Sequence, residues 1–163
     1  MRTKAIYTDS LAAVLHLLTP ENRTACLVSL YTGLRISDVL SIRTADVYKT
    51  RWTITEAKTG KRKTVRMPGW LRAQILHYAG KEYAFPHRTD QRRHRTRQAV
   101  WKDLNKAARV LHLKGVAPHS MRKTFACELR RQGFPETAIQ RALNHSSPTI
   151  TRLYSMAEEV RTR

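Results

Sequence analysis

The chain of 163 residues has few acidic residues, few cysteines and no long apolar run, and each shortage excludes a class of protein. Its 12 Asp and Glu stand against 31 Lys and Arg, which leaves a formal net charge of +19. This excess favours a polyanionic partner, nucleic acid first and an anionic membrane surface second, over a basic protein without such a partner. No stretch approaches the roughly 18 to 20 apolar residues of a membrane-spanning helix, so we expect no membrane insertion.

Cysteine usage and motif content narrow the choice further. Cys26 and Cys127 lie in helix-like apolar patterns without paired spacing, which argues against a disulfide framework or a structural zinc and predicts buried free thiols in a reducing compartment. The sequence has no H-E-x-x-H motif and no carboxylate cluster, and Gly60-Lys61 lacks the upstream glycine and the following Ser/Thr of a phosphate-binding loop. We therefore expect neither a metal nor a cofactor.

Hydrophobic residues make up 41% of the chain, which is enough to build the core of one domain. Most of them recur with helical spacing, and glycines mark several of the helix ends. The predicted helices cover residues 11–18, 19–33, 36–42, 70–79, 97–113, 120–132, 135–143 and the segment from 148 onward. We interpret residues 1–163 as a single, mainly α domain with a small antiparallel β-sheet, which belongs to the α+β class.

The small sheet is predicted over residues 45–67, where the apolar spacing changes from helical to alternating. Trp52, Ile54 and Glu56 fall on one face of the first strand. Residues 58–60 (KTG) form the turn, and residues 63–67 return as the second strand.

The basic residues are concentrated in the middle of the chain. Residues 1–34 contain three Lys/Arg and two acids, whereas residues 35–110 contain nineteen Lys/Arg and six acids. The densest run, residues 86–97 (PHRTDQRRHRTR), has no apolar period and predicts an exposed loop that leads into a helix capped near Thr96. Such a loop is either simply solvated or in contact with phosphates.

Six residues are candidates for chemistry, although none is diagnostic alone: Arg35, Lys58, His119, Arg122, His145 and Tyr154. Two arginines beside helix termini can clamp the oxygens of one phosphate, and a lysine on a turn can protonate a leaving oxygen. Histidines can move protons, and a tyrosine can form a covalent bond to phosphorus. The combination indicates a phosphoryl-transfer site without metal, whereas Tyr154 taken alone is more simply interpreted as an amphipathic ring partly packed in the core.

Four segments that carry these residues follow one another in a recognisable order: 32–40 (TGLRISDVL), 58–61 (KTGK), 119–126 (HSMRKTFA) and 143–147 (LNHSS), with Tyr154 after them. In this order they resemble the tyrosine recombinase (phage integrase) family. The resemblance covers nearly the whole chain but corresponds only to the C-terminal catalytic domain of that family. It therefore implies the tyrosine recombinase catalytic-domain fold.

The resemblance also implies how the reaction runs. Arg35 and Arg122 would bind and neutralise the scissile phosphate, and Lys58 would be the general acid that protonates the leaving 5′ oxygen. Tyr154 would be the nucleophile, which gives a 3′-phosphotyrosyl link. Because that ester keeps the bond energy, a 5′ hydroxyl can reseal the strand without ATP.

The remaining site residues have supporting roles in the resemblance. His119 would assist proton transfer on the base side, and His145 would hydrogen-bond the phosphate in the transition state. Asp38 matches the acidic position three residues after the first arginine, where it would have a structural role or support the residues that do the chemistry. The basic residues expected to contact the DNA are Lys61, Arg62, Lys63, Arg88, Arg92, Arg93, Arg95, Arg97 and Lys123.

The sequence departs from the family pattern in three respects. Lys123 stands where histidine is common, and Asn144 stands where glycine is common. Neither position carries the chemistry. Asn is second only to Gly in adopting a left-handed backbone conformation, so we expect activity to be retained. The helical core-binding domain that usually precedes the catalytic domain has no counterpart, which suggests either a naturally minimal recombinase or an excised domain.

The leading hypothesis is a site-specific recombinase that cleaves and rejoins double-stranded DNA, in the cytoplasm of a prokaryote or encoded by a phage. A type IB topoisomerase-like enzyme and a catalytically silent DNA-binding relative that regulates recombination are the alternatives. Exchanging strands between two duplexes needs four active sites, so we expect a homotetramer on DNA and, because of self-repulsion, a monomer in solution. Residues 156–163 are either a frayed end or an arm that docks on another subunit.

Overall fold

The computed structural model describes residues 3–6, 8–156 and 159–160. The described elements are, in chain order, β1 (Ala5–Ile6), α1 (Thr8–His16), α2 (Pro20–Thr32), α3 (Ile36–Leu40), α4 (Thr44–Val47), β2 (Arg51–Thr55), β3 (Arg62–Arg66), α5 (Gly69–Tyr78), α6 (Arg97–Val110), α7 (Pro118–Arg131), α8 (Glu136–Leu143), α9 (Pro148–Ser155) and β4 (Glu159–Val160). The predicted mainly helical class with a small antiparallel sheet is confirmed. No helix in the described part of the chain is long and apolar enough to cross a membrane.

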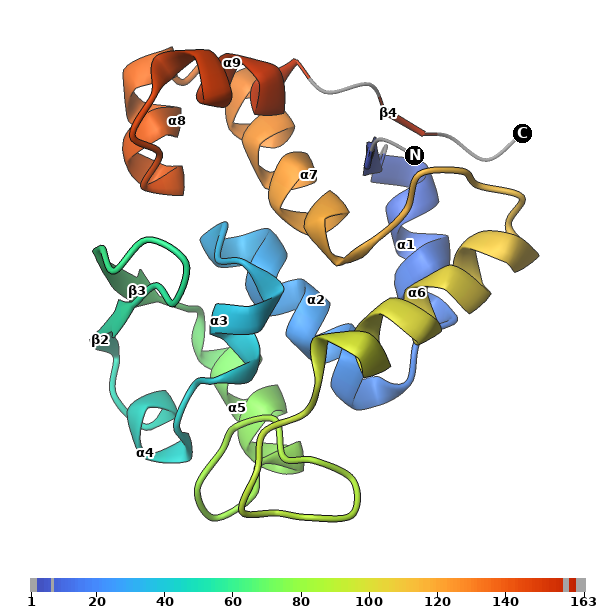
Figure 1. Cartoon of the computed structure of the whole chain (residues 1–163), viewed down its shortest axis with the longest axis vertical. Coiled ribbons are helices and arrows are strands. Elements are labelled where there is room, and N and C mark those ends of the chain that lie inside the picture. Colours follow the sequence, from blue (N-terminus) through green and yellow to red (C-terminus); the bar gives the residue numbers. More distant parts are fainter. Residues whose placement is uncertain (1–2, 7, 157–158, 161–163) are drawn as a thin grey trace.

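Helices α2 and α7 pack against each other and hold the other elements around them (Figure 1). Helices α3, α5 and α6 pack against α2, whereas α8 and α9 pack against α7. The β2–β3 hairpin lies at the edge of the molecule, between α4 and α8 in the view of Figure 1. This arrangement brings the end of α2, the hairpin turn, the start of α7 and the α8–α9 connection to one side of the α2–α7 pair.

The ends of the helices follow from local sequence. Gly33 ends α2 in the left-handed conformation (φ +66°), and its N–H donates to the Ser29 carbonyl at 2.8 Å. At the start of α6 the Thr96 hydroxyl accepts a hydrogen bond from the Ala99 N–H at 3.1 Å. Asn144 ends α8 with φ +56° and ψ +31°. The predicted stop at Gly33, the predicted cap at Thr96 and the left-handed conformation predicted for Asn144 are all confirmed.

The hairpin pairs β2 with β3 in antiparallel register, from Arg51 opposite Arg66 to Thr55 opposite Arg62. Trp52 and Val65 face the core and are buried. The prediction of a sheet from residue 45 was wrong at its start, because Thr44–Val47 forms the one-turn helix α4. A helix of four residues is too short to give a helical period, so the alternating spacing downstream concealed it.

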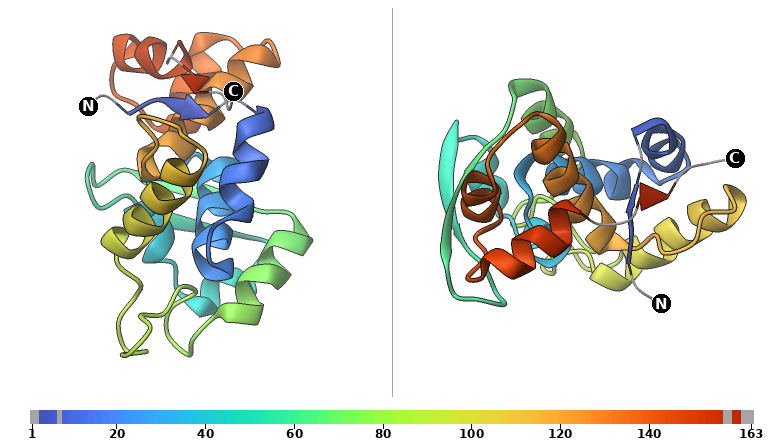
Figure 2. Two further views of the ribbon diagram at one scale, coloured as in Figure 1. Left: turned by 90° about the vertical axis from the view of Figure 1, so that its right-hand side faces the viewer. Right: turned by 90° about the horizontal axis from the view of Figure 1, so that it is seen from above.

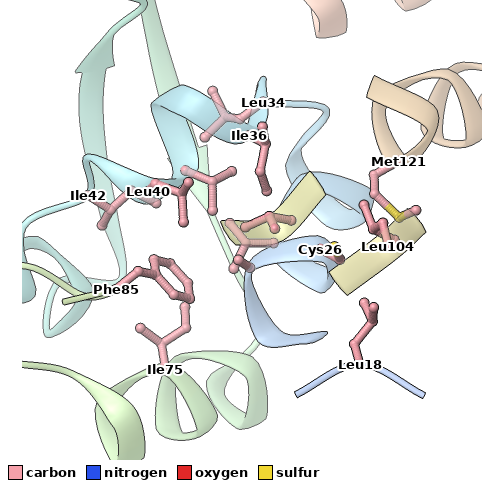
Figure 3. Close-up of a cluster of buried hydrophobic side chains, with 14 of the residues drawn as sticks. Leu18, Cys26, Leu34, Ile36, Leu40, Ile42, Ile75, Phe85, Leu104 and Met121 are labelled. Carbon is pink, nitrogen blue, oxygen red and sulfur yellow. The ribbon is translucent and has the colours of Figure 1, made fainter. Parts of the chain in front are cut away.

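The main core lies between α2, α3, α5, α6 and α7 (Figure 3). Leu34, Leu104 and Met121 of this core are fully buried, and Figure 3 shows Leu104 of α6 beside Cys26 of α2 and Met121 of α7. Cys26 and Cys127 are buried free thiols, as predicted, and burial raises the pKa of Cys26 to about 12. A second, smaller cluster is formed by Ala126 of α7 with Ile139 and Leu143 of α8. Phe125, Leu129 and Tyr154 pack against this cluster.

The two ends of the chain meet beside α7. Strands β1 and β4 pair in parallel, with Ala5 opposite Glu159 and Ile6 opposite Val160 (Figure 2). β1 is fixed to α7, because the Ile6 N–H donates to the Thr124 hydroxyl at 2.9 Å. Residues 159–160 of the predicted tail are therefore paired within the chain rather than frayed, while residues 157–158 and 161–163 of that tail lie outside the described residues.

Replacement of Gly33 by alanine tests how tightly the end of α2 is packed. An added Cβ would lie 2.6 Å from the Phe125 ring and 3.3 Å from Leu143 Cδ2. Gly133 has a similar φ of +82° but no atom within 4 Å of its added Cβ, so Gly133→Ala isolates the backbone strain of about 1–2 kcal/mol. In urea unfolding, Gly33→Ala should lower the free energy of unfolding by about 1–3 kcal/mol more than this control does, because overpacking adds to the backbone strain. Equal losses for the two variants would contradict the packing argument.

Candidate active site

Arg122 is the centre of the site, and its guanidinium is fully buried in the first turns of α7. Its Nη1 donates to the Gly33 carbonyl at the end of α2, and its Nη2 donates to the Leu143 carbonyl at the end of α8 at 2.5 Å. The last carbonyls of a helix have no partner within the helix, so a cation is well matched to them. Burial lowers the pKa of Arg122 to about 10, with the charge of Arg35 adding to the effect, so it stays protonated at neutral pH.

A buried carboxylate joins the two arginines. Glu56, directly after β2, is fully buried, and its Oε2 accepts from Arg35 Nη1 at 2.9 Å and from the Thr59 hydroxyl at 2.9 Å. Its Oε1 lies 3.9 Å from Arg122 Nη1. Because Thr59 belongs to the hairpin turn that also contains Lys58, this carboxylate fixes the turn against the arginine pair.

Asp38 holds the other side of the same turn. This residue of α3 is buried, and its Oδ1 accepts from the Ala57 N–H at 2.9 Å. Burial raises the pKa of Asp38, while the bond from Ala57 opposes that rise. The side chain contacts the residue before Lys58, so it positions the turn.

Tyr154 and the two histidines form the second half of the site. The Tyr154 hydroxyl is hydrogen-bonded to Nε2 of His119, and its ring packs edge-on against the rings of His119 and His145, with centroids 5.1 Å and 4.7 Å away. Nδ1 of His145 lies 3.2 Å from the Thr151 hydroxyl, which fixes this ring. Tyr154 also packs against the small apolar cluster. Its ring is therefore partly packed in the core while its hydroxyl faces His119, so a packing role and a chemical role are compatible.

The protonation of Tyr154, His119 and His145 depends on their burial and on the cations around them. Burial, followed by the charges of Arg122 and neighbouring cations, lowers the pKa of His119 and of His145 to about 4. Burial also raises the pKa of Tyr154, and the two arginines oppose that rise. At neutral pH both imidazoles are therefore uncharged, and His119 can accept the proton of the tyrosine hydroxyl through Nε2.

An open pocket of about 670 Å³ adjoins His119. Its wall includes Arg35, Lys58 and His119, together with Arg97 at the start of α6 and Thr3 of the N-terminal segment. Thr3 is held there because its carbonyl accepts from the Lys123 ammonium. Three cations from separate parts of the chain, Arg35, Lys58 and Arg97, thus line one opening, which is the arrangement expected for a bound phosphate group.

The six predicted chemical residues are brought together, but the nine residues predicted to contact DNA fall into three groups. Exposed positions are held by Arg62, Arg88, Arg92, Arg93 and Arg97. Lys61 instead donates to the Ser146 hydroxyl at 2.8 Å, and Arg95 donates to Asn22 at 3.3 Å.

Lys63 and Lys123 form the third group, because their ammonium groups bind protein carbonyls instead of lying open to the predicted contact with DNA. Lys63 is largely buried and donates to two main-chain carbonyls. Lys123 is buried, with its ammonium on the Thr3 carbonyl and 5.6 Å from the centre of the Tyr154 ring. Both ammonium groups are turned toward protein acceptors, because carbonyls from distant segments pack over them.

Glu56 is the functional residue that sequence reasoning missed. The alternation of the strand placed it on the same face as the buried Trp52, and a carboxylate on a buried face needs a cation as its partner. That signal could have identified it. Among the described residues no group of three or more His, Cys, Asp or Glu side chains could hold a metal ion.

Comparisons with known proteins identify a matching family and several relatives of this chain. The profile described as the phage integrase family matches residues 4–160. The chain is 33% identical over 137 residues to the probable integrase/recombinase YoeC of Bacillus subtilis. The matched region covers 81% of this chain and 75% of that protein. It spans about half the length of several Xer-type tyrosine recombinases that it matches.

Solved structures share the fold. The catalytic domain of the bacteriophage HP1 integrase superimposes with a TM-score of 0.71 at 20% identity, over 94% of this chain and 88% of that one. The XerH site-specific recombinase bound to its difH substrate superimposes with a TM-score of 0.74 at 17% identity, over 94% of this chain and 50% of that one. The fold predicted from the sequence is confirmed.

The buried histidines predict a pH-dependent stability. Because the pKa of His145 is about 4 in the folded chain against 6.5 for the free group, the unfolded chain takes up a proton first as the pH falls. Stability is then lost from about pH 6.5 down to about pH 4, and this one group, which is half-buried and partly screened by solvent, accounts for about 1 kcal/mol between pH 7.5 and pH 5. Urea unfolding of His145→Gln should show that much less pH dependence than the wild type. The exposed His16→Gln variant serves as the control, and a His145→Gln profile that matches it would refute the assignment.

Proposed function

Because the chain belongs to the phage integrase family, we propose that it is a catalytic domain that cleaves and rejoins duplex DNA at specific sites through a 3′-phosphotyrosyl link. The observation that carries the proposal is the Tyr154 hydroxyl, bonded to His119 beside a pocket lined by Arg35 and Lys58. The net charge of +19 supports duplex DNA as the substrate. The curated relative YoeC and the XerH complex with its difH substrate support the same reading.

The cleavage step can be written with each proton accounted for. The Tyr154 oxygen attacks the phosphorus, and its proton passes to Nε2 of His119. The bond from phosphorus to the 5′ oxygen breaks, and Lys58 gives that oxygen a proton. Arg35 and Arg122 neutralise the charge that develops on the non-bridging oxygens. Attack by a 5′ hydroxyl on the phosphotyrosine reverses each transfer and reseals a strand, so neither ATP nor a metal enters the scheme.

Binding of a phosphodiester also changes the pKa of His119, the proposed base, and of His145. In the free chain, burial lowers the pKa of His119 and His145, and the charges of Arg122 and Arg35 lower it further. A phosphate anion offsets those charges, so its binding raises the pKa of both imidazoles toward the ordinary value for histidine. His119 thereby becomes a better proton acceptor only when the substrate is in place, and His145 becomes a better hydrogen-bond donor to the phosphate.

Exchange between two duplexes sets the assembly that we propose. Each crossover cuts and rejoins four strands, so four copies of the site are needed, and a homotetramer on DNA supplies them. Without DNA, the self-repulsion of chains that each carry +19 favours the monomer.

Covalent trapping tests the nucleophile. The substrate is a pool of labelled duplexes with a randomised segment, nicked just 3′ of the candidate cleavage positions so that the 5′-hydroxyl fragment diffuses away. The wild type should give a protein–DNA adduct that survives SDS, and Tyr154→Phe should give none. Tyr48→Phe, which changes an exposed tyrosine, should behave as the wild type. An adduct with Tyr154→Phe would refute the nucleophile, whereas DNA binding by the wild type without any adduct would indicate a silent relative.

A modified leaving group tests the role of Lys58. Loss of a general acid should slow cleavage by about 10²- to 10⁴-fold in Lys58→Ala. A substrate whose bridging 5′ oxygen is replaced by sulfur should restore the rate, because a thiolate leaves without being protonated. Lys81→Ala removes an exposed lysine outside the pocket and serves as the control for charge. A Lys58→Ala defect that persists with the sulfur substrate would contradict the acid role.

A further inference from the structure

Lys63 of β3 connects two helices that are far apart in sequence. Its ammonium donates to the Thr32 carbonyl at 2.6 Å and to the Ala142 carbonyl at 2.5 Å. Thr32 is the last residue of α2, and Ala142 is the residue before the last one of α8. One partly buried cation thus binds terminal carbonyls of both helices, which have no partner within the helix.

Arg122 makes the same connection one residue further along each helix. It donates to the carbonyls of Gly33 and Leu143, which directly follow Thr32 and Ala142 in the chain. Two cations from different elements therefore bind consecutive carbonyls at the same pair of helix ends. We call Lys63, Arg122 and these four carbonyls the helix-end clamp.

The helix-end clamp is linked directly to the groups of the proposed reaction. Arg35 comes two residues after Gly33, and His145 comes two residues after Leu143. A shift of either helix end would move one of these side chains and also the acceptors that orient the Arg122 guanidinium. A displacement of about 1 Å in such a group can lower a rate about 10²-fold.

We propose that Lys63 is a positioning residue, which holds the ends of α2 and α8 together so that Arg122 and His145 face the scissile phosphate. The proposal deepens the proposed function and depends on it for its kinetic consequences. It also replaces the sequence-based expectation that Lys63 contacts DNA, since its ammonium is turned to protein carbonyls.

The charges around Lys63 make the clamp sensitive to alkaline pH. Burial and the charges of Arg122 and Arg35 lower its pKa to about 8, and the facing carboxylates Glu56 and Asp38 oppose this. As the pH rises through about 8, the ammonium loses its charge, and its bonds to the two carbonyls weaken to those of a neutral donor. Arginine at this position stays charged throughout that range.

Kinetic measurements distinguish positioning from DNA contact. In the trapping assay, Lys63→Met should lower the single-turnover rate about 10²-fold at saturating protein, with DNA affinity and its salt slope unchanged. Lys63→Arg should recover most of that rate. Arg66→Met, which removes an exposed charge from the same strand, is the matched control. Weaker DNA binding with a salt slope reduced by about one in Lys63→Met would overturn the proposal in favour of a phosphate contact, and so would a wild-type rate.

Hydrogen exchange tests the helix-end clamp without any reaction. At pH 7 and without DNA, Lys63→Met should exchange faster than the wild type and Arg66→Met in the peptide that covers residues 136–145. Between pH 7 and pH 9, where Lys63 loses its charge and Arg122 keeps it, protection of that peptide should fall in the wild type but not in Lys63→Arg, after correction for intrinsic rates. Unchanged protection in Lys63→Met would overturn the proposal. If the wild type forms no covalent adduct but these exchange results hold, the proposed function fails while the clamp stands.

Discussion

A guanidinium that is removed from water must be surrounded by acceptors, and this requirement at Arg122 underlies both the fold and the site. Its acceptors are the last carbonyls of α2 and α8, with the Glu56 carboxylate close by. Helix ends need donors as much as the buried arginine needs acceptors, so each side satisfies the other. Folding of three separate segments around one side chain is therefore the same event as assembly of the site.

The site carries more positive charge than it can balance internally. Glu56 and Asp38 face Arg35, Arg122 and Lys63, and the exposed Lys58 adds to the excess. Burial is the largest cause of the low pKa values of His119, Arg122 and Lys63, and this imbalance of charge lowers them further. A phosphodiester would supply the missing negative charge, so binding relieves a repulsion that folding has imposed.

Local signals in the sequence predicted much of this, and long-range packing decided the rest. Gly33 and Thr96 each determine a helix end through their own backbone or side chain, so those boundaries could be predicted. The ordered motifs predicted six residues for the chemistry, and the fold brings these six side chains together, while their roles stay a prediction. Nothing in the local sequence distinguishes Lys63 and Lys123 from exposed lysines. Their ammonium groups point inward because carbonyls from distant segments accept hydrogen bonds from them. The pairing of β1 with β4 involves two residues on each strand and could not be predicted from a period.

The N-terminal segment has a practical consequence for handling the protein. Thr3 forms part of the pocket wall, its carbonyl is held by Lys123, and the next residue, Lys4, donates its N–H to Gly115 at 2.9 Å. Lys123 in turn lies against the Tyr154 ring. An affinity tag joined directly before Thr3 is thus attached at the rim of the active site, so comparisons of rates between preparations require the tag to be removed or separated by a long flexible linker.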